Sequence, residues 1–598
     1  MSAAGRLDAG PRVRAYGDRA LMVDVPTLGE VHALAGALRA AGVPGVVDVV
    51  PAARTVLVVL DDAATSADLA RAAAAVREAW SSRTAATHPG EGSVVEIPVV
   101  YDGEDLPDVA AWAGLSVADL VARHSGREYV VAFGGFMPGF AYLSEVDPAI
   151  AAPRLATPRP RVPAGSVALA GGLTAVYPRP TPGGWRLLGR TDVALFDVDR
   201  VPPALLTAGT RVRFREVDRL PGDGDGDGDG DRGCGGAGAH ADGVGGPGAG
   251  AGAGAVAAED RARRAGDAVV PAGRVTGAAQ RAPTAGRVEV LATGPSTLVE
   301  DAGRPGWAAA GVGRSGAADR GAFRLLNRLL ANDEDAAALE VTLGGLVLLF
   351  HDRATVALTG AAASATLDGT PVGMQALLEA RAGSVLRLGL ARWGARTYVG
   401  VRGGFEAPTV LGSRSFDVLA GLGPAPLQAG DRLAVAPRPA RLPVVDSVPC
   451  AARPGGCAEL VVREGVRHEW FSDASWRDLL SATFEVAAAS NRVGLRLAGA
   501  VIERRAGDPP SEGLVAGAVQ VPPDGQPVLF LRDHPVTGGY PVIAVVTAAG
   551  IDAAAQLRPG DRLRFVADRS ADGASRSAPW SAPGGSGRSA RAGSQGES

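Results

Sequence analysis

The sequence holds 598 residues, with a formal net charge of −4 and a hydrophobic fraction of 46%. This length predicts several domains, and the nearly balanced charge argues against a nucleic-acid partner or an anionic membrane surface. All 60 basic residues are arginine, which excludes a Walker P-loop, a Schiff-base enzyme and a biotin carrier, because each requires a lysine.

The sequence also lacks an apolar run of about 18 residues and a leader-like N-terminus, so we expect a soluble cytoplasmic protein with no membrane partner. The three cysteines are Cys234, Cys450 and Cys457. Their odd number and the absence of paired CxxC spacing support neither a disulfide framework nor a zinc site. We therefore expect no metal bound by the chain's own ligands.

The first 90 residues predict a small α+β domain. A strand in "RVRAYGDRALMVDV" is interrupted at Gly17-Asp18, and a helix follows over Leu28–Ala41. Two β-rich segments, "VVDVVPA" and "TVLVVLDD", come next, and a second helix runs to Trp80 with Ser66 as its expected N-cap.

From 91 to 217 the sequence changes to short strands separated by Gly/Pro turns, which predicts a β-barrel. This unit carries the aromatic loop "GGFMPGF". Gly135 and Gly139 in that loop let backbone approach a ligand or adopt positive φ. The alternative is a hydrophobic plug that closes one end of the barrel.

The same unit contains "ATPRPRVPAGSVALAGG", where Arg159 and Arg161 flank prolines just before a turn of small residues. Guanidinium groups beside exposed backbone N–H groups suit a carboxylate or a phosphate. A solvated turn without a ligand is the alternative.

Residues 218–285 are low-complexity Gly/Asp and then Gly/Ala sequence with almost nothing to bury, which predicts a disordered linker. Its Asp-Gly run lacks the closing Glu of an EF-hand loop. The Ser/Gly/Arg-rich residues 568–598 predict a disordered tail. The chain is thus expected to be two globular blocks joined by a tether.

Three segments end in nearly the same phrase: "LTAGTRVRF", "LQAGDRLAV" and "LRPGDRLRF", which begin at Leu206, Leu427 and Leu557. Two of them also share upstream sequence, a small-Ala-Gly start and a Gly-Gly-aromatic turn. The repetition predicts three related β units. In the second block, the repetition predicts one barrel over 286–440 and another over 441–567.

The middle unit opens on a Gly-rich loop that carries Arg304, Arg314 and Ser315, before a helix over Arg320–Leu330 with Asp319 as its N-cap. The loop lacks the strand and helix context of a dinucleotide fingerprint. We take Arg304 as its candidate binding residue.

The last unit carries most of the candidate chemistry, as polar residues near its turns. A carboxylate, an amide, a hydroxyl and a phenol that converge on a barrel mouth suit a site that handles an amide; the alternative is that they only cap turns. No Ser-His-Asp or Cys-His set is legible, which argues against an acyl-enzyme. The candidate catalytic residues are Asp533, Glu512, Asn491 and Tyr540, and the candidate binding residues are Arg492, Gln520, Asp524, Thr537, Gly538 and Gly539.

Long motifs in both blocks resemble known families. "FGGFMPGFAYL", "TPRPRVPAGSVALAGG" and "YPRPTPGGWRLLGRT" resemble the allophanate hydrolase subunit 1 (KipI-like) family, that is, the B subunit of 5-oxoprolinase. "EDAGRPGWAAAGVGRSGAADR", "SNRVGLRL", "EGLVAGAVQVPPDGQP" and "TGGYP" resemble the allophanate hydrolase subunit 2 (KipA-like) family, the C subunit of 5-oxoprolinase. The resemblance implies a mainly β protein with α+β: three cyclophilin-like barrels and the small N-terminal domain.

It also implies a function: opening of the lactam 5-oxo-L-proline to L-glutamate, driven by ATP with Mg²⁺ and shared with the separate A subunit of 5-oxoprolinase. Phosphorylation of the lactam oxygen would precede attack by water. The B-like and C-like halves should contact each other, and the oligomeric state stays open. The alternatives are a biotin-dependent carboxyltransferase that acts on urea or another small amide, with biotin on a different chain, and a KipI-like inhibitor of a histidine kinase.

One stretch departs from the family pattern. Where the family often shows "DRQTTGGYP", this sequence has "DHPVTGGYP", with Pro535 and Val536 in place of Gln and Thr. If that pair touches substrate, then the substrate or its orientation differs here.

Overall fold

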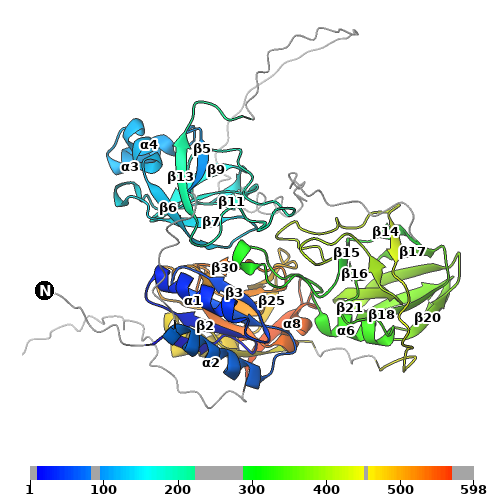
Figure 1. Ribbon diagram of the computed structural model, residues 1–598. Coiled ribbons are helices and arrows are strands. Elements are labelled where there is room, and N and C mark those ends of the chain that lie inside the picture. Colours follow the sequence, from blue (N-terminus) through cyan, green and yellow to red (C-terminus); the bar gives the residue numbers. More distant parts are fainter. Residues whose placement is uncertain (1–9, 83–93, 222–286, 450–455, 569–598) are drawn as a thin grey trace, which may run out of the picture.

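The computed structural model describes residues 10–82, 94–221, 287–449 and 456–568. These residues form a mostly β protein with barrel-like sheets and a small N-terminal α+β domain, as predicted (Figure 1). The predicted linker and tail lie outside the described residues, apart from residues 218–221 and 568. Within the described residues, no helix is both long enough and apolar enough to cross a membrane.

The N-terminal domain is a four-stranded antiparallel sheet, in the order β1-β2-β4-β3, with two helices packed on one face. The strand break at Gly17-Asp18 and the first helix are confirmed. The elements are β1 (Arg12–Ala15), β2 (Ala20–Asp24), α1 (Leu28–Ala41), β3 (Val46–Pro51), β4 (Thr55–Leu60) and α2 (Ser66–Ser82).

The predicted N-cap of α2 is wrong by one residue. Ser66 is already helical, and Thr65 caps the helix instead. The Asp68 amide donates to Thr65 Oγ1 at 3.4 Å, and the Thr65 amide donates to Asp68 Oδ2 at 2.8 Å. This reciprocal pair satisfies two backbone donors of the first turn, which a serine one position later does not do here.

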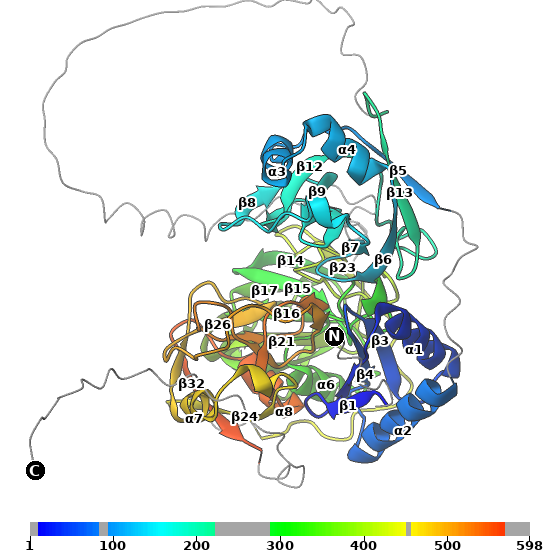
Figure 2. The same cartoon turned by 90° about the vertical axis from the view of Figure 1, so that its left-hand side faces the viewer.

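Both faces of the N-terminal sheet are buried. Leu21 and Val58 point towards α1 and α2. Met22 and Leu57, which alternate with them along the strands, pack against Phe530 and other residues of the last barrel. Figure 2 shows the blue N-terminal domain side by side with the orange last barrel. The sheet therefore joins the domain to the C-terminal half of the chain.

The first barrel is a seven-stranded sheet in the order β12-β9-β10-β7-β6-β13-β5, in which β5 and β13 are parallel. A bridge between Val100 and Arg190 links the two outer strands. Its elements are β5 (Val95–Val99), α3 (Leu106–Ala113), α4 (Val117–Ser125), β6 (Glu128–Gly134), β7 (Ala141–Ser144), η1 (Pro148–Ile150), β8 (Arg159–Val162), β9 (Ser166–Ala170), β10 (Leu173–Val176), β11 (Thr181–Gly183), β12 (Arg186–Arg190) and β13 (Arg211–Glu216).

The last barrel is closed, in the order β24-β31-β28-β29-β26-β25-β32, with β24 parallel to β32. Like the first barrel, it pairs its opening and final strands in parallel. Its elements are β24 (Ala458–Glu464), η3 (His468–Trp470), α7 (Asp473–Ser481), β25 (Phe484–Val486), β26 (Gly494–Ala498), β27 (Glu512–Gly513), β28 (Ala518–Gln520), β29 (Val528–Phe530), β30 (Thr537–Gly538), β31 (Val542–Val546), α8 (Ala548–Ala554) and β32 (Arg562–Ala567).

The middle unit is a ten-stranded sheet built around two long strands, β18 and β21. Its last strand, β23, runs antiparallel to the opening strand β14, whereas the outer barrels pair these strands in parallel. Its elements are β14 (Val288–Thr293), β15 (Ser296–Glu300), η2 (Ala308–Ala310), α6 (Arg320–Leu329), β16 (Ala338–Thr342), β17 (Leu346–Phe350), β18 (Ala354–Leu367), β19 (Thr370–Val372), β20 (Leu377–Ala380), β21 (Val385–Val401), β22 (Phe405–Glu406) and β23 (Arg432–Val435).

The shared phrase marks one turn geometry rather than one topology. Gly209, Gly430 and Gly560 have φ values of 89°, 91° and 87°, a region that favours glycine. Each turn leads into a final strand. The parallel pairing of that strand supports duplication for the two outer barrels, and the middle unit shares only the turn.

The aromatic loop of the first barrel docks onto the C-terminal half. Phe133 and Phe140 are buried in an aromatic cluster. The Phe136 amide donates to Thr537 Oγ1 at 3.2 Å, and the Gly139 amide donates to the Ala310 carbonyl at 3.2 Å. The loop is therefore part of the interface between the two halves.

Replacement of Gly135 by Ala should weaken this interface. A Cβ atom at Gly135 would lie 2.0 Å from Thr537 Oγ1, whereas one at Gly172, in the same barrel, would meet nothing within 4 Å. We expect Gly135→Ala to lower the free energy of unfolding by about 1–3 kcal/mol, as overpacking does. Gly172→Ala should change it little. Urea unfolding of both variants checks this, and equal midpoints would contradict the close contact.

Candidate functional site

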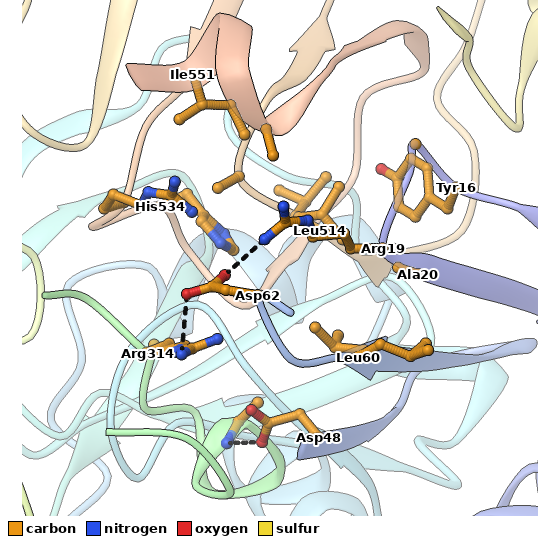
Figure 3. Close-up of a pocket in the computed structure, with 18 of the residues that line it drawn as sticks. Tyr16, Arg19, Ala20, Asp48, Leu60, Asp62, Arg314, Leu514, His534 and Ile551 are labelled. Atoms are coloured by element: carbon orange, nitrogen blue, oxygen red, sulfur yellow. Dashed lines mark hydrogen bonds and ion pairs between the residues drawn. The ribbon is translucent and has the colours of Figure 1, made fainter. Parts of the chain in front are cut away.

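A cavity of about 110 Å³ lies where the N-terminal domain, the middle unit and the last barrel meet (Figure 3). We call it the junction cavity. One part of its wall is apolar, with Leu60, Leu514 and Ile551 among its residues. The polar part includes Tyr16, Asp48, Asp62, Ser315, His534 and the arginines Arg19, Arg314, Arg320 and Arg532.

The arginines converge on a single carboxylate from the loop after β4. Asp62 Oδ2 accepts a bond from Arg320 Nη1 and lies 3.2 Å from Nη2 of both Arg314 and Arg324. Asp62 Oδ1 lies 3.3 Å from Arg19 Nη1. Burial alone would raise the pKa of Asp62, but the guanidinium groups, Arg320 foremost, hold it far below its usual range. Asp62 is therefore ionised.

Four arginines outnumber three acids, Asp18, Asp48 and Asp62, in this wall. Asp48 accepts bonds from the Gly306 and Ala308 amides, both at 3.1 Å, and so is engaged with backbone. Burial, and then the guanidinium groups of Arg532 and Arg314, lower the pKa of Arg320. The Nε atoms of all three arginines are buried without a hydrogen-bond partner. Such a wall suits an anionic group.

His534 contributes a neutral imidazole to the same cavity. Burial lowers the pKa of His534 to about 4. Its Nδ1 lies 2.8 Å from the Pro535 carbonyl, which can only accept, so Nδ1 carries the proton and Nε2 is left as an acceptor. Val536 is buried in the cavity wall. One of the two residues that depart from the family pattern thus lines this cavity.

Asp533 and Arg492, both predicted from the sequence, form a buried pair behind the cavity. Arg492 Nε and Nη2 donate to the two Asp533 oxygens at 2.9 and 3.1 Å. Ser315 Oγ and the Val418 amide donate to the same carboxylate at 2.7 and 3.0 Å. With both oxygens so engaged, Asp533 is placed to hold Ser315 and the neighbouring His534 rather than to act as a free base.

Glu340 and Glu300 complete this buried network. Arg492 Nη1 donates to Glu340, and its Nη2 lies 3.4 Å from Glu300 Oε1. Burial, with Glu340 and Asp533 nearby, raises the pKa of Glu300 although Arg492 opposes the shift. Removal of one partner from such a buried network is strongly destabilising. The network therefore fixes the last barrel against the middle unit.

A second group of predicted residues gathers around β27 and β30. Glu512 pairs with Gly538 across these short strands. The Glu512 Oε2 atom accepts from Arg467 Nε at 2.6 Å, while Oε1 is buried without a partner. Burial raises the pKa of Glu512 to about 7, although Arg467 opposes the shift. A carboxyl group with a pKa near 7 can give or take a proton under ordinary conditions.

Other predicted residues close to Glu512 are held by its neighbours. Gln520 Nε2 donates to the Tyr540 carbonyl at 2.8 Å. A Cβ atom at Gly538 would lie 2.8 Å from Gln520 Nε2, and one at Gly539 would lie 3.9 Å from Ser511 Oγ. Thr537, as described above, contacts the aromatic loop beside Gly135. These residues lie where the last barrel meets the aromatic loop of the first barrel.

The remaining candidates do not reach the junction cavity. Arg159 pairs with Glu104 and Asp105 at 2.5 and 2.7 Å within the first barrel. Arg161 faces solvent in the first barrel. Asn491 and Asp524 cap turns in the last barrel. Arg304 is buried against the Ser415 carbonyl, and Gly139 turns the aromatic loop with φ 76°.

Sequence reasoning missed several cavity residues. Arg314 and Arg304 lie on the same predicted loop, and only the structure shows that Arg314 is the one that lines the cavity. Asp62 follows the buried strand β4, which is the one signal that pointed to it. Tyr16 and Arg19 flank the strand break and carried no signal. Among the described residues, no group of three or more His, Cys, Asp or Glu side chains is placed to hold a metal ion.

Comparison with protein-family models matches residues 11–206 to "Carboxyltransferase domain, subdomain C and D" and residues 310–567 to "Carboxyltransferase domain, subdomain A and B". The second half is 35% identical to the C subunit of 5-oxoprolinase from Escherichia coli (strain K12), over 47% of this chain and 90% of that protein. A further match is 44% identical to the B subunit of 5-oxoprolinase from Escherichia coli O157:H7, over 30% of this chain and 81% of that protein.

The chain is also similar to a much longer protein and to a solved structure. "Urea amidolyase" of Saccharomyces cerevisiae is 32% identical over 48% of this chain, but over only 17% of its own length. Among solved structures, TTHA0988 is similar over 93% of this chain and all of its own, with 33% identity and a TM-score of 0.74. The arrangement of both halves in one chain therefore has a solved counterpart.

The raised pKa of Glu512 predicts a specific pH dependence of stability. Its folded pKa of about 7 exceeds the ordinary value of 4.5, so from pH 4.5 to 7 the folded chain keeps a proton that the unfolded chain loses. The free energy of unfolding should therefore fall as pH rises through this window, by about 3 kcal/mol in total. Glu512→Gln should remove this contribution.

Urea unfolding of both proteins at a series of pH values measures the difference. Arg467 keeps Asp24 as a partner in the variant, at 2.7 Å, so no cation is stranded. Parallel pH profiles for the two proteins would show that Glu512 does not titrate in this window.

Proposed function

Because the chain belongs to the family of the 5-oxoprolinase B and C subunits, built from carboxyltransferase domains, we propose that it is the fused B and C component of an ATP-dependent 5-oxoprolinase. Together with a separate A subunit, it opens the lactam of 5-oxo-L-proline to give L-glutamate. In this proposal, the substrate lies in the junction cavity.

The observation that carries this assignment is the division of the cavity wall into a cationic and an apolar part. The carboxylate of 5-oxoproline suits the guanidinium groups of Arg314 and Arg320, and its ring methylenes suit Leu60 and Leu514. The polar and apolar parts come from three domains and both halves of the chain. A site of this kind requires the fused or associated B-like and C-like parts.

The nucleotide is placed outside the junction cavity. Drug-sized ligands occupy clefts of about 300–1,000 Å³, and the junction cavity measures about 110 Å³. With no lysine in the chain, any phosphate that it contacts is held by arginine, backbone N–H groups or a metal ion. When ATP is bound to the complex, it supplies activation of the lactam oxygen, and the residues of this chain hold and orient the ring.

A second candidate is a biotin-dependent carboxyltransferase that acts on urea or another small amide. The similarity to urea amidolyase and the names of both matching family models favour it. A guanidinium-lined cavity also suits a carboxyl group in transit. Urea itself carries no carboxylate, so the excess of arginines favours 5-oxoproline as the substrate.

Reconstitution separates the two candidates. The purified chain is mixed with the A subunit of a bacterial 5-oxoprolinase, ATP, Mg²⁺ and 5-oxoproline, and we expect glutamate and ADP in equal amounts. In a parallel reaction with biotin carboxylase, a biotinylated carrier, bicarbonate and urea, we expect no carboxylated product. The opposite result in both reactions would replace the first proposal by the second.

Two arginines that share Asp62 provide a matched pair of variants. Arg314 lines the junction cavity, whereas Arg324 contacts Asp62 from outside it. Loss of a charged hydrogen bond corresponds to about 1.5–3 kcal/mol, so Arg314→Gln should raise KM for 5-oxoproline about 10–100-fold. Arg324→Gln should change it less than about threefold. Equal effects on KM would mean that the substrate carboxylate does not bind at this wall.

A further inference from the structure

Tyr16 carries a buried hydroxyl group that no partner satisfies. It lies between β1 and β2, is 1% exposed, and lines the junction cavity. In Figure 3, it lies on one side of the cavity and His534 on the other. Its hydroxyl oxygen makes no hydrogen bond. A buried polar group without a partner destabilises the fold, so this hydroxyl is placed where a ligand can satisfy it.

Glu512 presents the complementary case. It is also 1% exposed, and its Oε1 atom makes no hydrogen bond while Oε2 is held by Arg467. Tyr16 thus offers a free donor, and Glu512 a carboxyl oxygen that can bind or release a proton. Two unsatisfied polar atoms, supplied by two domains, occur at one interface.

The packing places these two groups in the same region. Tyr16 belongs to a single apolar cluster with Leu514 and Val466. Leu514 follows Glu512 by two residues, and Val466 directly precedes Arg467. Burial, followed by the negative charge of Glu512, raises the pKa of Tyr16 well above its usual value. The phenol is therefore protonated and can donate.

We propose that Tyr16 is a catalytic residue that donates a proton to the ring nitrogen as the lactam opens, and that Glu512 returns a proton to Tyr16. This role rests on the proposed function and adds a residue from the N-terminal domain to its chemistry. Tyr16 touches the substrate, and Glu512 acts through Tyr16. No signal in the sequence pointed to Tyr16 or to its position near Glu512.

The step balances when the ATP of the proposed function is counted. With the lactam oxygen phosphorylated, the oxygen of water bonds to the same carbon, the carbon–nitrogen bond breaks, and its electron pair goes to nitrogen. Nitrogen takes the proton of Tyr16 Oη, and Glu512 returns a proton to the Tyr16 oxygen through a bridging water, because the two groups do not bond to each other directly. The proton released by the attacking water restores Glu512 through solvent, and a second water releases phosphate from the new carboxyl group.

A second cavity lies beside Glu512, because the residue before it, Ser511, lines that cavity. It measures about 310 Å³ and is lined by Arg467 and Asp24, with Thr55 and Trp470 on its walls. Arg467 links this cavity to Glu512 by the 2.6 Å bond to Oε2. Glu512 therefore lies between the two cavities, because Leu514 lines the junction cavity and Ser511 lines the second one, while Arg467 holds Glu512 in place.

The groups that face Glu512 come from three elements and their loops. Arg467 is its direct partner. Asp24 and Arg14, on β2 and β1, lie 2.5 Å from each other, and Glu469 lies 3.6 Å from Arg14. The two arginines and two acids balance in charge, so ionisation of Glu512 adds the uncompensated charge. Burial is therefore the largest influence on the pKa of Glu512.

Tyr16→Phe tests the proposal in the reconstituted reaction with the A subunit, ATP and 5-oxoproline. The ring and its packing remain, and only the unsatisfied hydroxyl is lost. We expect kcat to fall about 100-fold or more, in the range of lost acid catalysis, with KM within threefold and the melting temperature unchanged or higher. Tyr129→Phe is the control, since its hydroxyl donates to the His124 carbonyl at 2.7 Å. It should lower the melting temperature and leave kcat unchanged.

Glu512→Gln supplies a readout that a structural role would not move. In the unchanged chain, kcat should fall as pH rises through about 7, where Glu512 loses its proton. In the variant, kcat should be lower and this limb of the pH profile should be absent. Turnover by Tyr16→Phe within threefold of the unchanged chain, or an unaltered profile in Glu512→Gln, overturns the proposal. If the unchanged chain gives no turnover, the proposed function itself fails, and this role fails with it.

Discussion

The arrangement of this protein depends on a sheet that must bury both of its faces. The strands β2 and β4 carry apolar side chains at nearly every position, so α1 and α2 can cover only one face. The other face needs the last barrel, and Met22 and Leu57 bury themselves there. Apolar burial of this kind is the main driving force for association. It brings the N-terminal domain to the C-terminal half, and the junction cavity forms at the edge of that contact.

The two halves meet a second time through loops that carry glycine at the points of closest approach. Gly135 faces Thr537, and a Cβ atom at Gly311 would lie 2.4 Å from the Met137 carbonyl. Glycine is needed at these points because backbone approaches backbone or a β-branched side chain. The aromatic motif of one half and the "TGGYP" motif of the other are thus two sides of one contact. The polar residues around Glu512 lie directly behind it.

Local patterns predicted much of the fold. The periodicity of Leu28–Ala41 and the cap at Asp319 describe contacts within a few residues, and both are confirmed. The parallel between the first and last barrels was also visible, because a repeated turn needs glycine at positive φ. The same turn in the middle unit shows the limit of this argument: a turn reports its own backbone and not how the following strand pairs.

The candidate site was less accessible, because its partners are far apart in the sequence. Asp533 and Glu512 looked alike as acids near turns. The structure separates them, since Asp533 receives four hydrogen bonds and Glu512 keeps one oxygen free. Asp62 could not be predicted either, because its role depends on ion pairs with Arg314 and Arg320, which lie in the other half of the chain. Only the docking of three domains turns isolated charges into one cationic wall.

The buried groups that stabilise this junction are different from those available for chemistry. The bidentate pair of Arg492 and Asp533 satisfies its buried groups and holds the last barrel to the middle unit. The Tyr16 hydroxyl, Glu512 Oε1 and the Nε atoms of Arg314, Arg320 and Arg532 are buried and unsatisfied, which weakens the fold unless something else binds them. Glu300, behind the Arg492–Asp533 pair, is also unsatisfied, but it does not line the junction cavity. The unsatisfied groups at the cavity mark it as the place where a ligand completes the structure.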